Sequence, residues 1–535
     1  MKRSIFAIIL LSALSISIHT SVFAAKRPAL HRFADSVFKV ANIFQSNMVI
    51  QQDKPFTIWG KATAGKSVVI KPDWSGEVVA IVAGHDNTWR TQIKVPKAIA
   101  GDFKPHTLTI TTKDTTITFN NLLIGDVWLA SGQSNMQYSL GGQPGKNNGV
   151  PDYETEVPAA NYPNIRWFYT DLNFKAKPYD EVTGHWVPCT PENAAKFSAV
   201  SYYFARSLYQ HVNIPIGIVL SNIGASTGQA WTSRKELESD TILYNKYLRD
   251  YDNSPRSKEV INSGFTFEKV TRPTLLYNAM IHPLAGLSIK GIIWYQGEFN
   301  RNDAGNYTLL MSHMVEGWRN DFGQGNVPFY LVQVPPFFWN NEDPTAFDYA
   351  IFREAQTNIR KAAPNTEMAV TIDDDEARNL HPRNKKPVGE RLAMIALNKD
   401  YGFKDINYTG PQVASLKMSG KKVKITYTKK SVAGGLKTSD NKPPRLFYVA
   451  GDNHVFYPAD AEIKGDRVIL RSDSVPDIKA VRYAFTNTSV TNFMNSAGLP
   501  AEPFRTDAWN EQKDIKKIKV DYEKLNKSQE PAKNQ

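Results

Sequence analysis

The middle of the chain alternates short apolar runs with longer segments in which apolar residues recur every three or four positions. The short runs have the length of buried strands, and the longer segments have the periodicity of helices. Such alternation predicts an α/β fold with a parallel sheet covered by helices on both faces. The predicted strands are 126–130, 165–169, 214–220, 289–295, 327–334 and 367–372, and the predicted helices include 200–211, 307–318 and 349–360.

Two stretches with a strand pattern flank this α/β region. In the first, short alternating runs are separated by turn formers such as Gly65-Lys66 and Asp86-Asn87, which predicts a small β-sandwich. The second begins after about Asn407, and the sequence leaves open whether the two β regions form one domain. The predicted parts are a signal peptide at 1–25, an N-terminal β-sandwich domain at 36–120, an α/β domain at 121–402, a C-terminal β region at 407–510 and a charged tail at 511–535.

The first residues have the layout of a secretory signal. Met1-Lys2-Arg3 is followed by an apolar stretch from Ile5 to Ile18 and by a small-residue cleavage site near Ala24 or Ala25. The alternative is a membrane anchor, but the stretch is short for a bilayer span of ~20 residues, and nothing later in the sequence matches one. We therefore expect no membrane anchor after signal cleavage.

The cysteine content and the charge bear on location and partners. The sole cysteine, Cys189, cannot form an internal disulfide, and an exported protein without disulfides fits a bacterial periplasm better than eukaryotic secretion. We predict an exported bacterial protein, periplasmic or secreted. The formal charge of +12 permits attraction to anionic glycans. No nucleic-acid recognition module is visible, so we expect no nucleic-acid partner, and nothing indicates the oligomeric state.

A serine stands where the first predicted strand of the α/β region ends. The run from Asp126 to Gln137 passes from apolar residues into the small, polar turn Ser131-Gly132-Gln133-Ser134. Such a turn frees backbone N–H groups, and a helix that starts there favours the negative charge that acyl transfer develops on oxygen. The alternative is a serine that only caps a helix. The turn alone does not separate a nucleophile from a capping residue.

Two later strings place more polar residues at strand ends. Gly291 to Glu298 predicts a buried strand whose carboxyl end delivers an amide, a glycine and a carboxylate to the edge of the sheet. Thr371 to Pro382 contains an acidic loop and then His381, just before the helical pattern 388–397. A histidine there suits a general base. Ligands of parallel sheets gather at the carboxyl ends of the strands, where all of these residues fall.

Together, the three strings resemble the SGNH hydrolases, specifically the sialate O-acetylesterase branch of carbohydrate esterases. The resemblance is carried by Gly132-Gln133-Ser134-Asn135-Met136, Trp294-Tyr295-Gln296-Gly297-Glu298 and Leu380-His381-Pro382, and by a fourth string with Val481 to Phe485, Gly498 to Ala501 and Pro503 to Asp507. It covers nearly all of the chain after the predicted signal. It implies an SGNH-hydrolase-like parallel sheet flanked by helices as the catalytic domain, beside the N-terminal and C-terminal β-sandwich-like regions that the strand pattern predicts.

Ester hydrolysis needs a nucleophile, a base and donors aimed at the developing oxyanion. Ser134 is the predicted nucleophile and His381 the predicted base, and the resemblance implies the same pair. The predicted oxyanion donors are the Ser134 N–H, a backbone N–H near Gly224 and the Gln296 side chain, which takes the place that asparagine holds in many SGNH enzymes. Related esterases commonly have two glycines and a threonine at Gly224-Ala225-Ser226, so this chain departs at the latter two positions.

The acid that would orient the histidine is not at its usual place. SGNH hydrolases often carry aspartate three residues before the histidine, where this chain has Arg378. Asp373 aligns with an aspartate of the esterase branch and ends the final predicted strand, so it is the predicted third catalytic residue. A Ser-His dyad helped by a backbone carbonyl is the alternative.

Other residues near these strings have supporting roles in the prediction. Glu298 is expected to brace the nucleophile turn through hydrogen bonds. Trp339 follows Pro335-Pro336 in a predicted loop, so we expect it to bind substrate, although core packing is the alternative. The acidic run from Asp373 to Glu376 offers oxygen ligands for Ca²⁺ but lacks the spacing of an EF-hand. We expect neither a metal nor a cofactor.

The predicted function is a serine esterase that removes O-acetyl groups from a sugar, with sialic acid as the first choice, through an acetyl-enzyme intermediate. Its predicted partner is the O-acetylated sugar or glycan. An acetyl xylan or pectin-type polysaccharide deacetylase is the alternative within the enzyme class, because the motifs specify the chemistry and leave the sugar open. A non-catalytic glycan-binding protein is the alternative from another class.

Overall fold

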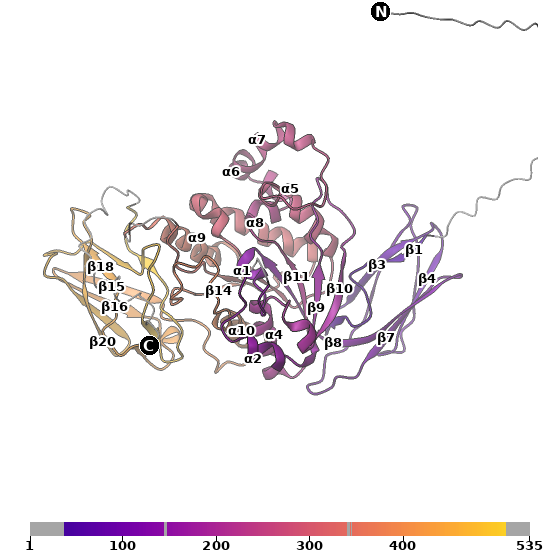
Figure 1. The fold of residues 1–535 in the computed structure, drawn as a ribbon, viewed down its shortest axis with the longest axis horizontal. Helices are drawn as coiled ribbons and strands as arrows, with labels where there is room; N and C mark the ends of the chain where they lie inside the picture. Colours follow the sequence, from indigo (N-terminus) through magenta and orange to yellow (C-terminus); the bar gives the residue numbers. More distant parts are fainter. Residues whose placement is uncertain (1–36, 144–146, 340–342, 344, 510–535) are drawn as a thin grey trace, which may run out of the picture. The chain divides into compact units, whose positions relative to one another are not determined.

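The computed structural model describes residues 37–143, 147–339, 343 and 345–509 (Figure 1). The predicted signal peptide and the charged tail lie outside these residues.

The N-terminal β region consists of short strands that share one core. β1, β3 and β6 form an antiparallel sheet, and β4 pairs with both β5 and β7. Apolar side chains on alternate positions, such as Ile58, Val68, Ile70 and Leu108, are buried together. The strands are β1 (Phe38–Val40), β2 (Val49–Gln51), β3 (Phe56–Ala62), β4 (Ser67–Pro72), β5 (Val79–Val82), β6 (Thr88–Ile93) and β7 (His106–Thr111).

The next strand, β8 (Thr116–Gly132), belongs to two regions at once. Its first part pairs antiparallel with β7, and residues Leu123–Gly125 pair parallel with β2. Its last part, from Asp126, is the central strand of the α/β sheet. The boundary predicted at residues 120 and 121 therefore falls inside one continuous strand, because the predicted strand 126–130 is the second part of β8.

The α/β sheet has the strand order β10-β9-β11-β8-β12-β13-β14. All neighbouring pairs are parallel except β10 with β9, so one antiparallel strand lies at one end of this order. The predicted parallel sheet is therefore confirmed, as part of a larger mixed sheet. Its strands after β8 are β9 (Tyr162–Thr170), β10 (Gly184–Cys189), β11 (Ile216–Asn222), β12 (Gly291–Tyr295), β13 (Phe329–Val332) and β14 (Thr366–Ala369).

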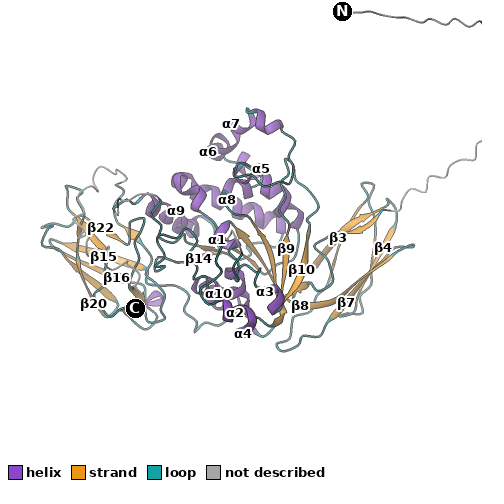
Figure 2. Ribbon diagram, in the orientation of Figure 1, coloured by secondary structure: helices purple, strands orange, loops and turns teal. Residues whose placement is uncertain are grey.

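Helices cover both faces of this sheet (Figure 2). Alternate residues of β8 show the division: Trp128 packs with α4 and α10, whereas Leu129 packs in the core that includes α8 and α9. The four helical patterns predicted at 200–211, 307–318, 349–360 and 388–397 correspond to α4, α8, α9 and α10. The helices of the α/β region are α1 (Ser134–Gln137), α2 (Tyr153–Ala159), α3 (Pro191–Ala194), α4 (Ala199–Val212), α5 (Arg234–Glu238), α6 (Thr241–Leu243), α7 (Arg249–Asp252), α8 (Ala304–Phe322), α9 (Asp348–Ala362) and α10 (Lys386–Asp400), with the 3₁₀ helix η7 (Glu298–Asp303) after β12.

The C-terminal β region has a core of its own. Two four-stranded sheets, β15-β16-β21-β20 and β19-β18-β22-β24, and the pair β17-β23 surround side chains such as Ile425, Val449 and Val468. The elements are β15 (Val413–Ser419), β16 (Lys422–Tyr427), α11 (Lys429–Val432), β17 (Leu436–Thr438), β18 (Phe447–Ala450), β19 (Tyr457–Pro458), β20 (Asp460–Lys464), β21 (Arg467–Arg471), β22 (Ala480–Tyr483), β23 (Phe493–Asn495) and β24 (Phe504–Arg505).

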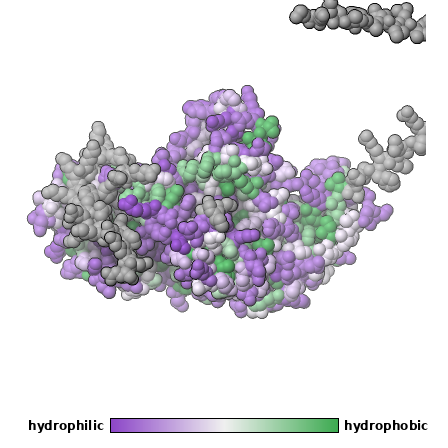
Figure 3. Space-filling model, in the orientation of Figure 1, coloured by the Kyte–Doolittle hydropathy of each residue, from purple (hydrophilic) through white to green (hydrophobic). Residues whose placement is uncertain are grey.

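Polar residues predominate on the face of the protein drawn in Figure 3, where hydrophobic residues form separate areas. Of the helices within the described part of the chain, none has the length and apolar character needed to cross a membrane.

A buried ion pair in the C-terminal β region generates a stability prediction. Arg482 donates to both carboxylate oxygens of Asp507, at 3.0 and 2.6 Å, and the two side chains are 6% and 2% exposed. Removing one partner of such a pair leaves an uncompensated buried charge, so Asp507→Asn should lower the free energy of unfolding by about 3–5 kcal/mol. Urea denaturation followed by tryptophan fluorescence measures the change.

The matched control is Asp473→Asn. Asp473 forms an ion pair with Lys421 at 3.4 Å, but its side chain is fully exposed, so this change should matter little. Equal stability losses in the two variants would contradict the prediction.

Candidate active site

The backbones of two strands fix the turn that carries Ser134. β8 ends at Gly132, whose φ is +137° and where a Cβ atom would lie 2.1 Å from the carbonyl oxygen of Tyr295. Gln133 donates its N–H to the same oxygen at 2.9 Å. Only glycine permits this approach of β8 to β12. The approach places Ser134, the first residue of α1, at the carboxyl edge of the sheet.

The structure brings Ser134 and His381 together. His381 lies in the loop between β14 and α10, and its Nε2 is 2.8 Å from Oγ of Ser134. A neutral imidazole at this distance can accept the proton of the hydroxyl group. The two residues predicted as nucleophile and base therefore have the geometry that acyl transfer requires, although 247 positions separate them.

The surroundings of His381 favour its neutral form. Burial disfavours the charged ring, and the ammonium group of Lys385 repels it further, so that the pKa of His381 is lowered to about 4. At neutral pH the ring is therefore uncharged and can act as a base.

Asp373 lies where its carboxylate pairs with Arg391 of α10. The two guanidinium N–H groups donate to the two carboxylate oxygens at 2.8 and 2.6 Å. In the described part of the chain, no hydrogen bond is made to Nδ1 of His381. No contact there supports the role of Asp373 as the orienting acid, and that role stays a prediction. The alignment of Asp373 with an aspartate of the esterase branch and its place at the end of the final predicted α/β strand suggested the role. Neither observation revealed the pairing with Arg391.

The remaining acidic residues hold the loop itself. Asp374 accepts the N–H of Glu376 at 3.0 Å, and burial raises the pKa of Asp374 to about 6. Glu376 accepts from the Arg383 N–H at 2.8 Å and from the Asn379 side chain at 2.9 Å. Asn379 in turn accepts the N–H of His381 at 3.0 Å. These bonds connect the acidic loop to the segment that carries the histidine.

Gly224 lies beside the nucleophile. A Cβ atom on Gly224 would be 3.5 Å from Cβ of Ser134, in ordinary contact. Its N–H donates to Oε1 of Gln137 at 3.0 Å. Ser134 is the first residue of a helix, where N–H groups lack intrahelical acceptors. The backbone donors predicted for an oxyanion therefore lie close together, and the Gln137 side chain occupies one of them.

Gln296 is fully buried and hydrogen-bonded within the protein. Its Nε2 donates to the carbonyl oxygen of Ser226 at 3.0 Å and to Oδ1 of Asn300 at 2.8 Å, and its Oε1 accepts from Tyr307 at 2.8 Å. Both amide hydrogens are therefore used. Gln296 would have to exchange one of these partners to donate to an oxyanion, so its predicted role stays a prediction without direct geometric support.

Asn135 and Lys385 connect the three motifs of the sequence analysis, which assigned neither residue a role. The Asn135 side chain donates to Oε1 of Glu298 at 2.5 Å and to the carbonyl oxygen of Leu380 at 3.1 Å. Lys385 donates to Oδ1 of Asn135 at 2.5 Å. Glu298 thus contacts the nucleophile turn, as its predicted bracing role requires. Asn135 stood inside the quoted motif, whereas Lys385 gave no signal beyond its place four residues after His381.

Trp339 packs among protein side chains. The guanidinium group of Arg301 lies 3.6 Å from the centroid of its ring, and Phe337 and Tyr349 make edge contacts at 4.9 and 5.4 Å. Arg301 also donates to the carbonyl oxygen of Glu298 at 3.1 Å, which connects this cluster to the site. Because Arg301 covers one face of Trp339, the expectation that Trp339 binds substrate stays a prediction.

A second arginine stacks on the same aromatic segment. Arg378 lies 4.5 Å from the ring centroid of Phe338, and Phe338 donates its N–H to the carbonyl oxygen of Ala377 at 3.2 Å. Within the described residues, neither Arg301 nor Arg378 forms an ion pair. Two guanidinium groups that form no ion pair with a described carboxylate therefore lie against the segment 337–339.

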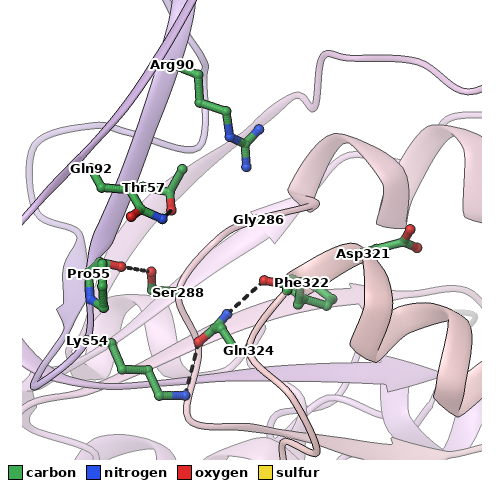
Figure 4. Close-up of a pocket in the computed structure, with 11 residues that line it drawn as sticks. Lys54, Pro55, Thr57, Arg90, Gln92, Gly286, Ser288, Asp321, Phe322 and Gln324 are labelled. Atoms are coloured by element: carbon green, nitrogen blue, oxygen red, sulfur yellow. Dashed lines mark hydrogen bonds between the residues drawn. The ribbon is translucent and has the colours of Figure 1, made fainter.

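The structure also contains a cavity of about 460 Å³ elsewhere in the fold (Figure 4). It lies where the N-terminal β region meets the end of α8, and Lys54 points across it toward Gln324, to which it donates at 3.0 Å. None of the predicted site residues lines this cavity, so we assign it no part in the reaction.

Comparison with known families identifies the class of the chain. The model of the family described as carbohydrate esterase, sialic acid-specific acetylesterase, matches residues 124–398, just over half of the sequence. The matched residues include Ser134, Gln296 and His381. The chain therefore belongs to this family, which confirms the family predicted from its motifs.

Relatives with known names or structures extend the match to nearly the whole chain. Sialate O-acetylesterase of Mus musculus is 28% identical over 88% of this chain and 95% of its own length, and that of Homo sapiens is 26% identical over 88% and 93%. A carbohydrate acetylesterase from Xanthomonas citri, known from its crystal structure, is 32% identical to this chain, with a TM-score of 0.77. The match covers 88% of this chain and 100% of the other. The chain is a carbohydrate O-acetylesterase.

The pairing of Asp373 generates a prediction that separates structure from catalysis. Spoiling the acid of a Ser-His-Asp triad costs ~10⁴ in turnover. If Asp373 serves the ion pair with Arg391, Asp373→Asn should lower kcat by less than about 10-fold and should instead reduce the melting temperature. Hydrolysis of p-nitrophenyl acetate and thermal unfolding measure the two effects. A loss near ~10⁴ with an unchanged melting temperature would restore Asp373 as the catalytic acid.

Proposed function

We propose that the chain hydrolyses O-acetyl esters of a sugar with Ser134 as nucleophile and His381 as general base. The single observation that carries this proposal is the 2.8 Å contact between Oγ of Ser134 and Nε2 of His381. Oγ attacks the acetyl carbonyl carbon while Nε2 takes the hydroxyl proton. When the tetrahedral intermediate collapses, the sugar oxygen leaves with that proton, and Ser134 carries the acetyl group. Water activated by His381 then releases acetate.

The backbone N–H groups of Ser134 and Gly224 are the proposed oxyanion donors. Gly224 supports this role by its position beside Ser134 and by its N–H, which already holds an amide oxygen. The tetrahedral oxyanion would take the place of that oxygen. Gln296 remains a proposed third donor that must first release Ser226 or Asn300.

Sialic acid is the sugar that we propose. Relatives that match most of the chain are named sialate O-acetylesterases. The guanidinium groups of Arg301 and Arg378 suit the carboxylate of such a sugar, since arginine binds carboxylates through two parallel hydrogen bonds. A neutral polysaccharide such as acetyl xylan is the second candidate. The Xanthomonas citri protein, which is more similar to this chain than the two sialate O-acetylesterases are, is described only as a carbohydrate acetylesterase.

We also propose an SGNH-hydrolase-like catalytic domain and export from a bacterial cell. The parallel strands that end at Ser134 and near Gln296, with helices on both faces, support the first statement. The charged, apolar and small-residue order of residues 1–25 supports the second. Because β8 is continuous, the N-terminal sandwich and the catalytic domain are proposed as parts joined by a shared strand.

The serine mechanism predicts a large loss on removal of one oxygen atom. Ser134→Ala should lower kcat for p-nitrophenyl acetate by at least about 1,000-fold, because the acetyl-enzyme cannot form. The matched control is Ser131→Ala, three residues upstream. Oγ of Ser131 is buried and forms no hydrogen bond to the described residues, so this variant should keep the wild-type rate. Equal rates for Ser134→Ala and the wild type would contradict the mechanism.

The sugar is tested by acetate release. At equal ester concentration, we expect a higher kcat/KM for O-acetylated sialic acid than for acetylated xylan. A preference for xylan would replace sialic acid by a neutral polysaccharide while leaving the serine mechanism intact. An inactive wild type on all acetyl esters would favour a glycan-binding protein.

The low pKa of His381 predicts activity well below neutral pH. Only the neutral ring can accept the proton of Ser134, and the neutral form dominates above a pKa of about 4. The acid limb of kcat/KM should therefore lie near pH 4, below the ~6.5 of an ordinary histidine. Initial rates across this range measure it, with circular dichroism as a check that the protein stays folded. A limb near ~6.5 would contradict the prediction.

A further inference from the structure

Lys385 is a buried cation close to the site but outside the reacting pair. Its side chain is 1% exposed, and it lies directly before α10, four residues after His381. Its ammonium group donates to Oδ1 of Asn135 at 2.5 Å and lies 5.1 and 5.5 Å from the ring centroids of Tyr138 and Tyr295. Burying a charge is costly unless it is paired and hydrogen-bonded. The position of Lys385 therefore calls for a physical reason.

The Asn135 amide, which Lys385 contacts, connects three segments that are distant in sequence. Asn135 follows Ser134 in α1 and is fully buried. Its two N–H groups reach Oε1 of Glu298, just after β12, and the carbonyl oxygen of Leu380, the residue before His381. One side chain thus connects the nucleophile turn to the histidine segment and to the end of β12.

Lys385, Glu298 and the Leu380 carbonyl oxygen all favour the same orientation of this amide. An ammonium group has only donors, so the atom of Asn135 that faces it must be the oxygen. A flipped amide would place its NH₂ group against the ammonium and its oxygen against a carboxylate and a carbonyl, and all three contacts would be lost. In the observed orientation every polar atom of the Asn135 side chain has a complementary partner.

We propose that Lys385 is a positioning residue for the reaction: its buried ammonium group helps to fix the orientation of the Asn135 amide, and this amide holds Ser134 and His381 in register. The proposal rests on the serine mechanism described above. Lys385 touches neither the substrate nor the reacting atoms, and it acts through Asn135.

Charge gives Lys385 a second effect on the same pair. The acidic groups that face it are Asp374, Glu298 and Glu376, which together favour its charged form, while burial lowers the pKa of Lys385 to about 8. After burial, Lys385 is the group that lowers the pKa of His381. Removing the cation should therefore raise the pKa of His381, and the acid limb of kcat/KM should move to higher pH.

The experiment compares three variants of the full chain on p-nitrophenyl acetate. Lys385→Met removes the donor and the charge at similar length. Lys385→Gln removes the charge but keeps an N–H donor, on a side chain that is one atom shorter. Lys386→Met makes the same charge change at the next residue, which is exposed and lies 3.9 Å from Glu156. For each variant, kcat, KM, the pH dependence of kcat/KM and the melting temperature are measured.

We expect Lys385→Met to lower kcat by about 10- to 100-fold with little change in KM, because a misoriented reacting pair slows the chemical step. Its acid limb should move to higher pH. Lys385→Gln should show the same movement of the limb with a smaller loss of kcat, and it remains informative if Lys385→Met does not fold. Lys386→Met should resemble the wild type in kcat and in its pH profile.

Two results would overturn the proposal while the serine mechanism stands. One is wild-type kinetics for Lys385→Met beside an inactive Ser134→Ala. The other is a lower kcat with an unmoved acid limb in both Lys385 variants, which would mark Lys385 as a stability residue only. Full activity of Ser134→Ala would instead overturn the serine mechanism and this inference with it.

Discussion

The pairing of β8 with its neighbours is the constraint on which the rest of the structure depends. This one strand exchanges hydrogen bonds with β7 and β2 in its first part and with β11 and β12 in its last part. It therefore fixes the register between the N-terminal β region and the α/β sheet. The end of β8 also positions the active site. Gly132 lies so close to the Tyr295 carbonyl oxygen that only glycine fits there, and this close approach places Ser134 at the start of α1. A side chain at position 132 would disturb the sheet and the nucleophile turn together.

The sequence contained enough information to predict the layers of the fold and the reacting pair. Strands of a parallel sheet are buried on both faces and therefore appear in the sequence as apolar runs. Helices that cover the sheet bury one face and therefore show helical periodicity. The strands and the helices α4, α8, α9 and α10 were predictable for this reason. Ser134 and His381 were found because short motifs surround them. The continuity of β8 was hidden, because its two ends belong to regions with different strand patterns and were predicted as separate strands.

The contacts that adjust the site could not be predicted in the same way. These contacts join side chains from separate segments. They are the ion pair of Asp373 with Arg391, the hydrogen bond from Lys385 to Asn135 and the contact of Arg301 with the ring of Trp339. The hydrophobic periodicity of a sequence does not indicate which polar side chains pair with one another. A carboxylate at a strand end is compatible with an ion pair or with a catalytic role, and only the packed neighbours separate the two.

The contact between Gly224 and Gln137 has a consequence for how the site distinguishes an ester from its transition state. The N–H of Gly224 donates to the neutral amide oxygen of Gln137, which is an exposed residue. The carbonyl oxygen of an ester is also a neutral acceptor, so replacing the Gln137 oxygen with it changes the strength of the hydrogen bond little. An oxyanion forms a charge-assisted hydrogen bond that is roughly twice as strong. With the Gly224 N–H as the proposed oxyanion donor, Gln137 would compete with the ground-state ester for it, and a charged tetrahedral mimic such as a boronate should profit from this donor more than an intact acetyl ester does.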